Sequence, residues 1–223
     1  MGAKVGAITI GQSPRTDVIP EMIPIVGPDV EIIQGGALDG LTTTEVAAMA
    51  PREGDYVLVT KLRDGTSVQV AKRHIVTRMQ EQIRRVVEEG AQVVALLCTG
   101  EFPELTSPRL LVEPQILLHE VTAALAGARR LGVVVPAAEQ IEQAATRWEG
   151  LGTDLRVVAA SPYGEMERIR TAAAALREWG AELLVLDCIG FTAAMKGLVR
   201  DIVRVPVILP RTLLARILAE LLA

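Results

Sequence analysis

The sequence predicts an α/β protein of two pseudo-symmetric lobes, each with a parallel sheet flanked by helices. Apolar runs of strand length alternate with stretches of helical period, which is the pattern of α/β folds. One segment occurs twice without gaps, as GAQVVALLCTG at 90–100 and GAELLVLDCIG at 180–190. In each copy an apolar run of buried-strand type leads into a cysteine, and a glycine follows two residues later. Residues 4–11 (KVGAITIG) also resemble residues 130–136 (RLGVVVP), so the duplication extends beyond the cysteine strand.

The strands are predicted wherever short β-branched and apolar runs are bounded by glycine, proline or polar residues. The first ends at Gly11, a strand of the second half is stopped by Pro136, and the piece at 68–70 is short. The expected strands cover 5–10, 30–33, 56–60, 68–70, 93–97, 131–135, 155–159, 183–186 and 205–209.

The helices are predicted from apolar residues spaced at 3.6-residue intervals. The stretch 72–89 carries such a stripe and is closed by Gly90, and Gly180 stands in the same position after 165–179. The expected helices cover 72–89, 137–149, 165–179, 192–203 and the long apolar stretch 211–222.

The order strand, helix, strand within each half implies parallel sheets with right-handed crossovers. We expect an N-terminal lobe at 1–113, which has an extra segment near 28–70, and a C-terminal lobe at 114–210. The terminal helix, 211–223, is expected to pack back on the N-terminal lobe. Ligands of open α/β sheets bind beyond the carboxyl ends of the strands, so we predict a site in a cleft between the lobes.

Composition excludes several classes of protein. Of 223 residues, 50% are hydrophobic and only 3% aromatic, and the net charge is −4. The charge argues against nucleic-acid binding, and the scarcity of aromatics argues against base stacking. No apolar run is long enough to span a membrane and no signal peptide is evident, so we expect a cytoplasmic protein. Scattered hydrophobic residues leave room for a homodimer face that the sequence does not locate.

Cys98 and Cys188 are the only cysteines and occupy the same register of the repeat. A thiolate and a thiol on opposite sides of a carbon centre could remove a proton from one face and return it to the other, which is a cofactor-free stereoinversion. Buried free cysteines are often simply small core residues. The matched pair favours the functional interpretation over that one.

A metal site is not expected, because the chain has no Cys-x-x-Cys and only two histidines. His74 is expected to cap a helix or face solvent, and His119 is expected to be structural. Neither is proposed as the base.

The loop 11–17 (GQSPRTD) follows the first strand. Gly11 permits a tight turn, Ser13 offers a hydroxyl, and Arg15 could bind a carboxylate through two parallel hydrogen bonds. The alternative is a helix start with Ser13 as N-cap and Pro14 at the first helical position. Both interpretations are compatible, since a helix N-terminus also binds anions.

Further candidates lie in the loops after other strands. Thr60 and Arg63 could reach the cleft, although Asp64-Gly65 is a strong turn signal. Thr99 could donate its hydroxyl to the substrate, and Asp187 could orient groups or be a buried acid. Thr192 is equally well suited to capping a helix. Gly100, Gly190 and Phe191, beside the cysteines, complete the expected substrate contacts.

Four segments together resemble the AroM family, and the likeness extends over essentially the whole chain: residues 8–15 (ITIGQSPR), 62–65 (LRDG), 112–114 (VEP) and 186–191 (LDCIGF). AroM proteins in turn resemble the aspartate/glutamate/hydantoin racemase superfamily. The resemblance implies two α/β lobes with one cysteine from each, places the acid/base pair on Cys98 and Cys188, and makes Ser13 and Thr99 candidate substrate contacts. Racemases show other residues after each cysteine, so the groups that would hold an ammonium are not identified.

The leading hypothesis is a cofactor-independent racemase or epimerase of a small carboxylate or amide-type carbon acid, such as an amino acid or a hydantoin. Cys98 and Cys188 are the expected bases. The resemblance also implies two alternatives, a single-cysteine decarboxylase or cis–trans isomerase, and a non-catalytic small-acid-binding protein linked to aromatic metabolism. No metal, cofactor, nucleic acid or membrane is expected as a partner.

Overall fold

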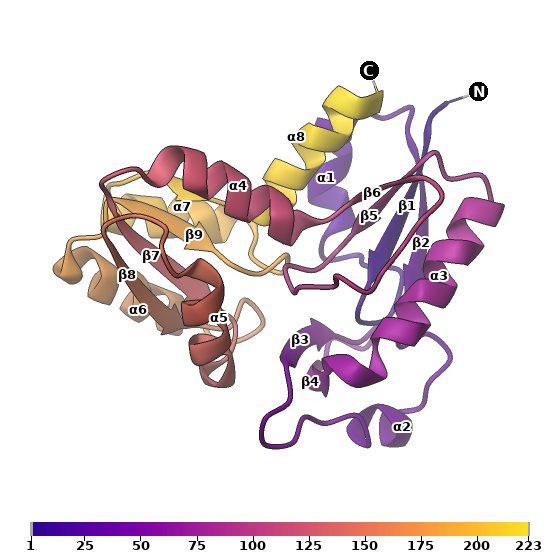
Figure 1. Cartoon of the computed structure of the whole chain (residues 1–223), viewed down its shortest axis with the longest axis horizontal. Coiled ribbons are helices and arrows are strands. Elements are labelled where there is room, and N and C mark those ends of the chain that lie inside the picture. Colours follow the sequence, from indigo (N-terminus) through magenta and orange to yellow (C-terminus); the bar gives the residue numbers. More distant parts are fainter. Residues whose placement is uncertain (1, 223) are drawn as a thin grey trace. The chain divides into compact units, whose positions relative to one another are not determined.

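The computed structural model describes residues 2–222, which divide into two compact units (Figure 1). Unit 1 comprises residues 1–114 and 214–223, and unit 2 comprises residues 115–213. The boundary lies at Pro114, the first residue of helix α4, and the last helix, α8, begins in unit 2 and continues into unit 1.

Unit 1 contains a four-stranded parallel sheet and a separate antiparallel hairpin. Its main elements are β1 (Lys4–Thr9), α1 (Ile19–Val26), β2 (Glu31–Gly36), α2 (Thr43–Ala47), β3 (Val57–Lys61), β4 (Ser67–Ala71), α3 (Val76–Glu88), β5 (Val93–Leu96) and β6 (Leu110–Val112). A 3₁₀ turn, Lys72–His74, precedes α3.

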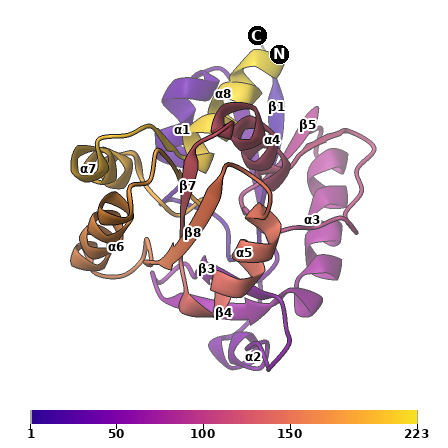
Figure 2. The ribbon, with the colours of Figure 1, turned by 60° about the vertical axis from the view of Figure 1, so that its left-hand side comes forward.

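Unit 2 contains a second four-stranded parallel sheet. Its elements are α4 (Pro114–Ala126), β7 (Arg130–Val135), α5 (Ile141–Trp148), β8 (Asp154–Ala159), α6 (Met166–Trp179), β9 (Leu183–Leu186), α7 (Ala193–Val203), β10 (Val207–Ile208) and the first turn of α8 (Pro210–Leu222). A 3₁₀ turn, Ala138–Gln140, precedes α5. In Figure 2, α6 and α7 lie on one side of β7 and β8, and α5 lies on the other.

The two parallel sheets have the same topology. Their strand orders are β2-β1-β5-β6 and β8-β7-β9-β10, so β1 corresponds to β7 and β5 to β9. The registers agree as well: Gly6 pairs with Val94 in one sheet, and Gly132 pairs with Leu184 in the other. The α/β fold with parallel sheets flanked by helices is therefore confirmed, and the sequence repeat is a structural repeat.

The glycine of each first strand makes room for a helix. A Cβ on Gly6 would collide with the side chain of Val86 in α3, and one on Gly132 would come within 3.1 Å of Leu176 in α6. Val86 and Leu176 each stand four residues before the glycine that follows the helix. The two strand glycines thus allow close helix-to-sheet packing at equivalent positions.

Both of these helices end in the same way. Gly90 and Gly180 adopt positive φ values of 98° and 83°. The next amide donates back to the carbonyl of Val86 in the first case and of Leu176 in the second, at 3.0 Å in each. This is the left-handed glycine stop expected at a helix C-terminus, and it aims the chain into the cysteine-bearing strand.

The extra segment of unit 1 forms a small subdomain of α2 and the β3–β4 hairpin (Figure 1). The expectation that 56–60 belongs with the other strands is corrected here, because β3 pairs only with β4 and runs antiparallel to it. The connection between β3 and β4 closes through the Leu62 amide on the Thr66 carbonyl (2.8 Å), with Gly65 at φ 91°. The turn expected at Asp64-Gly65 is confirmed.

The alternative interpretation of Ser13 as the N-cap of a helix is wrong. α1 begins at Ile19, and Ser13 uses its hydroxyl elsewhere, as described below. Sequence reasoning also did not identify α2, β6 or α4, because the first two are short and the apolar residues of α4 do not form a single clear stripe. None of the helices in residues 2–222 is long and apolar enough to cross a membrane.

Candidate active site: two cysteine loops

The two cysteines occupy equivalent loops, one in each unit. Cys98 follows the end of β5 by two residues, and Cys188 follows the end of β9 by two residues. Both are buried and form no disulfide, with 8% and 5% of their surface exposed. Each stands at the carboxyl edge of a parallel sheet, the edge at which open α/β folds bind ligands.

Each sulfur accepts a backbone hydrogen bond from the residue two positions later. The Gly100 amide donates to Cys98 Sγ at 3.3 Å, and the Gly190 amide donates to Cys188 Sγ at 3.4 Å. A backbone N–H directed at sulfur stabilises negative charge there. The structural repeat therefore delivers a thiol with the same amide donor in both units.

Packing explains the glycine that follows each cysteine. A Cβ on Gly100 would lie 2.8 Å from Leu58 Cδ2 of β3, and one on Gly190 would lie 2.6 Å from Tyr163 Cζ and 2.9 Å from Pro162. Neither glycine has a positive φ value. The absence of a side chain, rather than conformational freedom, is what these positions require.

In unit 1 the loop after β1 is organised around Asp39, a residue that sequence reasoning did not select. Its carboxylate accepts the Ser13 amide (2.8 Å), the Ser13 hydroxyl (2.6 Å) and the Gly36 amide (2.9 Å). The available signal was an Asp-Gly pair, Asp39-Gly40, soon after a strand ending in two glycines. Ser13 is therefore a buried residue with a fixed rotamer, held by its neighbour.

The turn between β3 and β4 is attached to the same loop. The Arg63 guanidinium donates hydrogen bonds to the Ser13 carbonyl and to Asp39 (3.1 Å). The Arg63 backbone amide donates to the Gln12 side chain at 3.0 Å. A Cβ on Gly11 would collide with the Thr60 hydroxyl. The structure thus brings together Gly11, Ser13, Thr60 and Arg63, four residues that the sequence placed in two separate loops.

The Thr60 hydroxyl is buried and has no hydrogen-bond partner among the described residues. Buried hydroxyls are nearly always satisfied by protein, water or a ligand. Its position beside Gly11 keeps Thr60 among the candidate contacts.

Arg15 is buried and faces its own loop. Its guanidinium makes two parallel hydrogen bonds of 2.8 Å to Asp17 and a third, of 2.9 Å, to the Thr9 hydroxyl. Burial alone would raise the pKa of the Asp17 carboxyl, but the hydrogen bonds and charge of Arg15, with a contribution from Lys61, lower that pKa below its ordinary value. A substrate carboxylate at Arg15 would share the guanidinium with Asp17.

A small polar cavity opens between these two loops. Its volume is about 70 Å³, and it is lined by Gln12, Pro14, Arg15, Thr16, Asp17, Lys61, Leu62, Arg63 and Gly65. Three of these side chains are cationic and one is anionic. The space and the charge suit a carboxylate-sized group.

In unit 2 the residue before the cysteine is part of a buried ion pair. Asp187 accepts hydrogen bonds from Arg147 and, at 2.9 Å, from the indole nitrogen of Trp148. The side chains of Arg147 and Asp187 are 7% and 1% exposed. The second oxygen of Asp187, Oδ1, has no partner among the described residues. Sequence reasoning named Asp187 as a buried acid or an orienting group but did not find Arg147.

Arg211, at the start of α8, is fully buried and was also missed. It donates to the Ile189 carbonyl from Nε (3.1 Å) and Nη2 (2.9 Å), and from Nη2 to the Gly190 carbonyl (3.0 Å). An arginine at the polar start of an amphipathic helix ordinarily predicts an exposed residue, so the sequence carried no signal for this contact.

Two of the remaining expected contacts, Phe191 and Thr192, have structural roles of their own. Phe191 is a core residue of unit 2 with no exposed surface. Thr192 caps α7, because its hydroxyl accepts the Met195 amide at 3.1 Å. Thr99, beside Cys98, is 7% exposed. Within residues 2–222 no group of three or more acidic, histidine or cysteine side chains could hold a metal ion.

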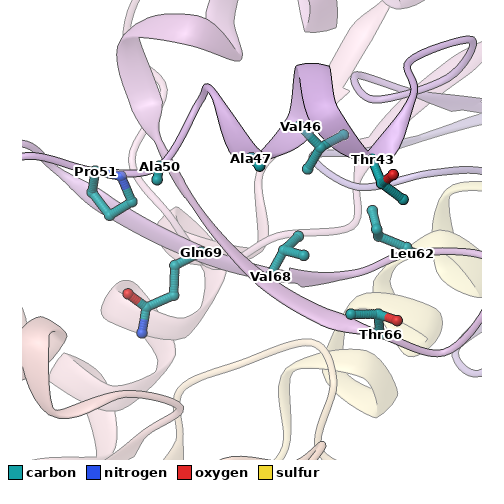
Figure 3. Close-up of a pocket in the computed structure, with 9 residues that line it drawn as sticks. All are labelled: Thr43, Val46, Ala47, Ala50, Pro51, Leu62, Thr66, Val68 and Gln69. Carbon is teal, nitrogen blue, oxygen red and sulfur yellow. The ribbon is translucent and has the colours of Figure 1, made fainter.

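A larger cavity of about 570 Å³ lies elsewhere in unit 1, between α2 and the β3–β4 hairpin. Figure 3 shows Val46 of α2 and Val68 of β4 facing each other across it. Its lining contains no ionisable side chain, since the nine residues are Thr43, Val46, Ala47, Ala50, Pro51, Leu62, Thr66, Val68 and Gln69. It therefore has no side-chain acid or base to offer.

The AroM family model matches residues 5–222 of the sequence, which includes both cysteine loops and the loop after β1. The chain belongs to the AroM family. No curated protein sequence matches this AroM family member.

Solved structures share its fold at low sequence identity. Allantoin racemase from Klebsiella pneumoniae is 16% identical with a TM-score of 0.62, covering 99% of this chain and 87% of its own. Arylmalonate decarboxylase is 14% identical, with a TM-score of 0.65 and coverages of 99% and 92%. Aspartate racemase from Picrophilus torridus is 13% identical, with a TM-score of 0.66 and coverages of 98% and 94%. The fold of this chain is that of racemase-like proteins.

Proposed function

We propose that this protein is a cofactor-independent racemase or epimerase of a small carbon acid, with Cys98 and Cys188 as its two acid/base groups. The observation that carries the proposal is the matched pair of cysteine loops. Each unit supplies one buried sulfur at the carboxyl edge of its sheet, with a glycine amide donating to it. Two such groups suffice for proton exchange at carbon.

The chemistry balances without a redox partner. One cysteine, as a thiolate, removes the proton from the stereogenic carbon and becomes a thiol. The electron pair of the broken C–H bond is held as an enolate by the adjacent carbonyl. The other cysteine, as a thiol, gives its proton to the opposite face and becomes the thiolate. The product is the mirror-image centre, and the two thiols have exchanged protonation states.

Residues of unit 1 are proposed to hold the substrate's carboxylate or amide-type group. The small cavity between the loops after β1 and β3 presents Arg15, Lys61 and Arg63 together. Thr60, with its unpartnered hydroxyl, and Ser13 lie in the same pair of loops. Thr99 is proposed to contact the substrate beside Cys98. Among the proteins of similar fold, the two names allantoin racemase and aspartate racemase fit an amide-type and a carboxylate substrate.

The first test examines whether the two sulfurs can act on one carbon. A short bifunctional methanethiosulfonate reagent should bridge Cys98 and Cys188 within one chain, giving a single adduct by mass spectrometry. The variants Cys98→Ser and Cys188→Ser are the matched controls, since each should take up the reagent at one end only. Two independent adducts in the unsubstituted protein, with no bridge, would rule out the two-base mechanism.

The second test examines the reaction itself. Single enantiomers of aspartate, glutamate and allantoin are incubated in heavy water, and deuterium at the stereogenic carbon is followed by NMR. We expect exchange with one of these classes and its loss, by at least about a hundredfold, in either cysteine variant. Circular dichroism verifies that the variants are folded. Exchange that persists in both variants would contradict the assignment.

One observation favours a second candidate, a decarboxylase that uses a single cysteine. Charged side chains brace the Cys188 loop, through Asp187 and Arg211, and arylmalonate decarboxylase has a similar fold. In such a reaction the substrate loses carbon dioxide, and the thiol protonates the resulting enolate. Carbon dioxide release from a substituted malonate that is abolished by Cys188→Ser but not by Cys98→Ser would select this candidate.

A further inference from the structure

The peptide group between Ile189 and Gly190 is hydrogen-bonded at both ends. Its N–H, which belongs to Gly190, donates to Cys188 Sγ at 3.4 Å. Its C=O, which belongs to Ile189, accepts two hydrogen bonds from Arg211, at 3.1 Å and 2.9 Å. A cation bound to the oxygen of a peptide polarises that peptide and strengthens its N–H as a donor. Arg211 therefore acts on the sulfur through one peptide group.

Arg211 is held rigidly in this position. The side chain has no exposed surface, and Nη2 also donates to the next carbonyl, that of Gly190, at 3.0 Å. Three hydrogen bonds from one planar guanidinium to two successive carbonyls leave the loop no freedom to rotate the Gly190 amide away from the sulfur. The same contacts keep a positive charge within one peptide group of Cys188.

The corresponding position of the other repeat is neutral. The strand registers align Leu111 with Val207, so that Gln115 corresponds to Arg211. The proline that begins the helix is matched as well, as Pro114 in α4 and Pro210 in α8. The amide donor to sulfur is thus common to both cysteines, whereas a guanidinium behind that amide belongs to the Cys188 repeat.

Other ionisable groups flank the Cys188 loop. Asp187 is paired with Arg147 and Trp148 of α5, and the Tyr163 hydroxyl lies against Gly190. On the other side, α6 and α7 contribute apolar side chains to the core around Cys188: Ile169, Ala172, Ala173, Leu176, Met195, Val199 and Val203. The carboxylate of Asp187 is engaged by Arg147, so Arg211 supplies the charge that acts on the loop from α8.

We infer that Arg211 is a positioning residue that stabilises the thiolate of Cys188, so that Cys188 is the proton-accepting cysteine of the resting protein and Cys98 the proton-donating one. The division into acceptor and donor rests on the proposed racemase chemistry. The effect of Arg211 on the reactivity of Cys188 does not depend on it.

The experiment measures alkylation by iodoacetamide as a function of pH, because only the thiolate reacts. Cys188 is followed in a Cys98→Ser background, and Cys98 in a Cys188→Ser background. We expect Cys188 to react at lower pH than Cys98, although the two sulfurs are similarly buried. Equal profiles for the two cysteines would overturn the inference, and this comparison needs no substitution at Arg211.

Substitution of Arg211 then tests its role directly. Arg211→Gln should slow alkylation of Cys188 at pH 7 by about tenfold and move its profile to higher pH. Arg211→Lys keeps the charge and should retain most of the rate, and the profile of Cys98 should not move. Arg216→Lys, at an exposed position of the same helix, is the matched control.

A merely structural Arg211 would give a different result. Loosening the loop would expose Cys188 and accelerate its alkylation at every pH, without moving the profile, and that outcome contradicts the inference. If Arg211→Gln does not fold, the alkylation rate of Arg211→Lys and the comparison of the two cysteines in the presence of Arg211 test the inference instead. None of these measurements uses a substrate, so a failure of the proposed reaction and a failure of this inference are seen separately.

Discussion

The two cysteine loops are alike in their main-chain contacts to the sulfur and differ in the side chains around it. Both sulfurs accept the amide of the glycine two residues later. The preceding residue is Leu97 in one loop and Asp187 in the other, and the buried Asp187 needs Arg147 as a partner. Sheet register therefore preserves the main-chain geometry of a duplicated site, while the surrounding side chains are free to diverge.

The loops after the first strand of each sheet also differ in their side chains, but here the charged residues lie in unit 1. After β1, Arg15 and Asp17 form a salt bridge with a nearly buried guanidinium, and Ser13 is bound to Asp39. After β7, the chain passes through Pro136 and Ala137 into a 3₁₀ turn. Charged anchors are therefore found in the β1 loop of unit 1 and in the cysteine loop of unit 2.

The largest expected effect comes from breaking the ion pair beside Cys188. Arg147→Met leaves Asp187 buried with an unpaired charge, which should lower the free energy of unfolding by about 3–5 kcal/mol. Urea denaturation measures the change. Adding Asp187→Leu, the counterpart of Leu97, should recover most of the loss, because apolar residues often replace a buried ion pair at little cost. A near-normal free energy of unfolding for Arg147→Met alone would contradict the buried pairing of Arg147 with Asp187.

The glycine after each cysteine is expected to rank next. Gly190→Ala should cost about 1–3 kcal/mol, because the new Cβ meets the Tyr163 ring and Pro162. Gly100→Ala should cost less, since the flexible end of Leu58 can move. Gly197→Ala, where a Cβ meets nothing within 4 Å, is the control and should stabilise α7 by up to about 1 kcal/mol. A larger cost at Gly100 than at Gly190 would refute this account.

The third prediction concerns the salt bridge of the β1 loop. The pKa of Asp17 is lowered in the folded protein, so its contribution to stability is present above the ordinary aspartate range and is lost as pH falls through the lowered value. Asp17→Asn should cost roughly 1–2 kcal/mol at pH 7 and weaken the loss of stability on acidification. Urea midpoints between pH 2 and pH 7 measure both. Asp154→Asn, at an exposed carboxylate of β8, should change neither the stability at pH 7 nor its loss on acidification.

The smallest expected effect is at Glu113, where the other repeat has the buried Leu209. Burial raises the pKa of Glu113, so the folded protein holds this proton more tightly than the unfolded chain. The wild-type protein should therefore lose a little stability as pH rises from the ordinary glutamate range through the raised pKa, and Glu113→Gln should not. A slightly higher urea midpoint for Glu113→Gln at pH 7, and no difference near pH 3, are the expected results.

Much of the fold was predictable because it depends on local patterns. The buried run at 183–186, the helix stop at Gly90 and the cap at Thr192 all appear where the sequence predicted them. The Ser-Pro pair resembles a helix start, but α1 begins only at Ile19, and Ser13 bonds to Asp39 instead. The antiparallel pairing of β3 with β4 was missed because nothing local distinguishes it from a parallel strand.

The candidate site was predicted in part for the same reason. Cys98 and Cys188 were selected from the repeat alone, and so was the glycine that follows each of them. Asp39, Arg147 and Arg211 were not found, since each makes contacts with groups more than twenty residues away, namely Ser13, Asp187 and Ile189. Their contacts follow from the strand order rather than from any pattern near them in the chain.

Local patterns alone specify the duplicated strand, its cysteine and its glycine, because apolar periodicity and turn chemistry act between near neighbours. The strand order decides which side chain lies behind the glycine amide that faces each sulfur. The sequence does not show whether Asp187 and Arg211 are exposed or buried. In the folded protein both are buried beside Cys188, and their charges interact more strongly there than they would in water.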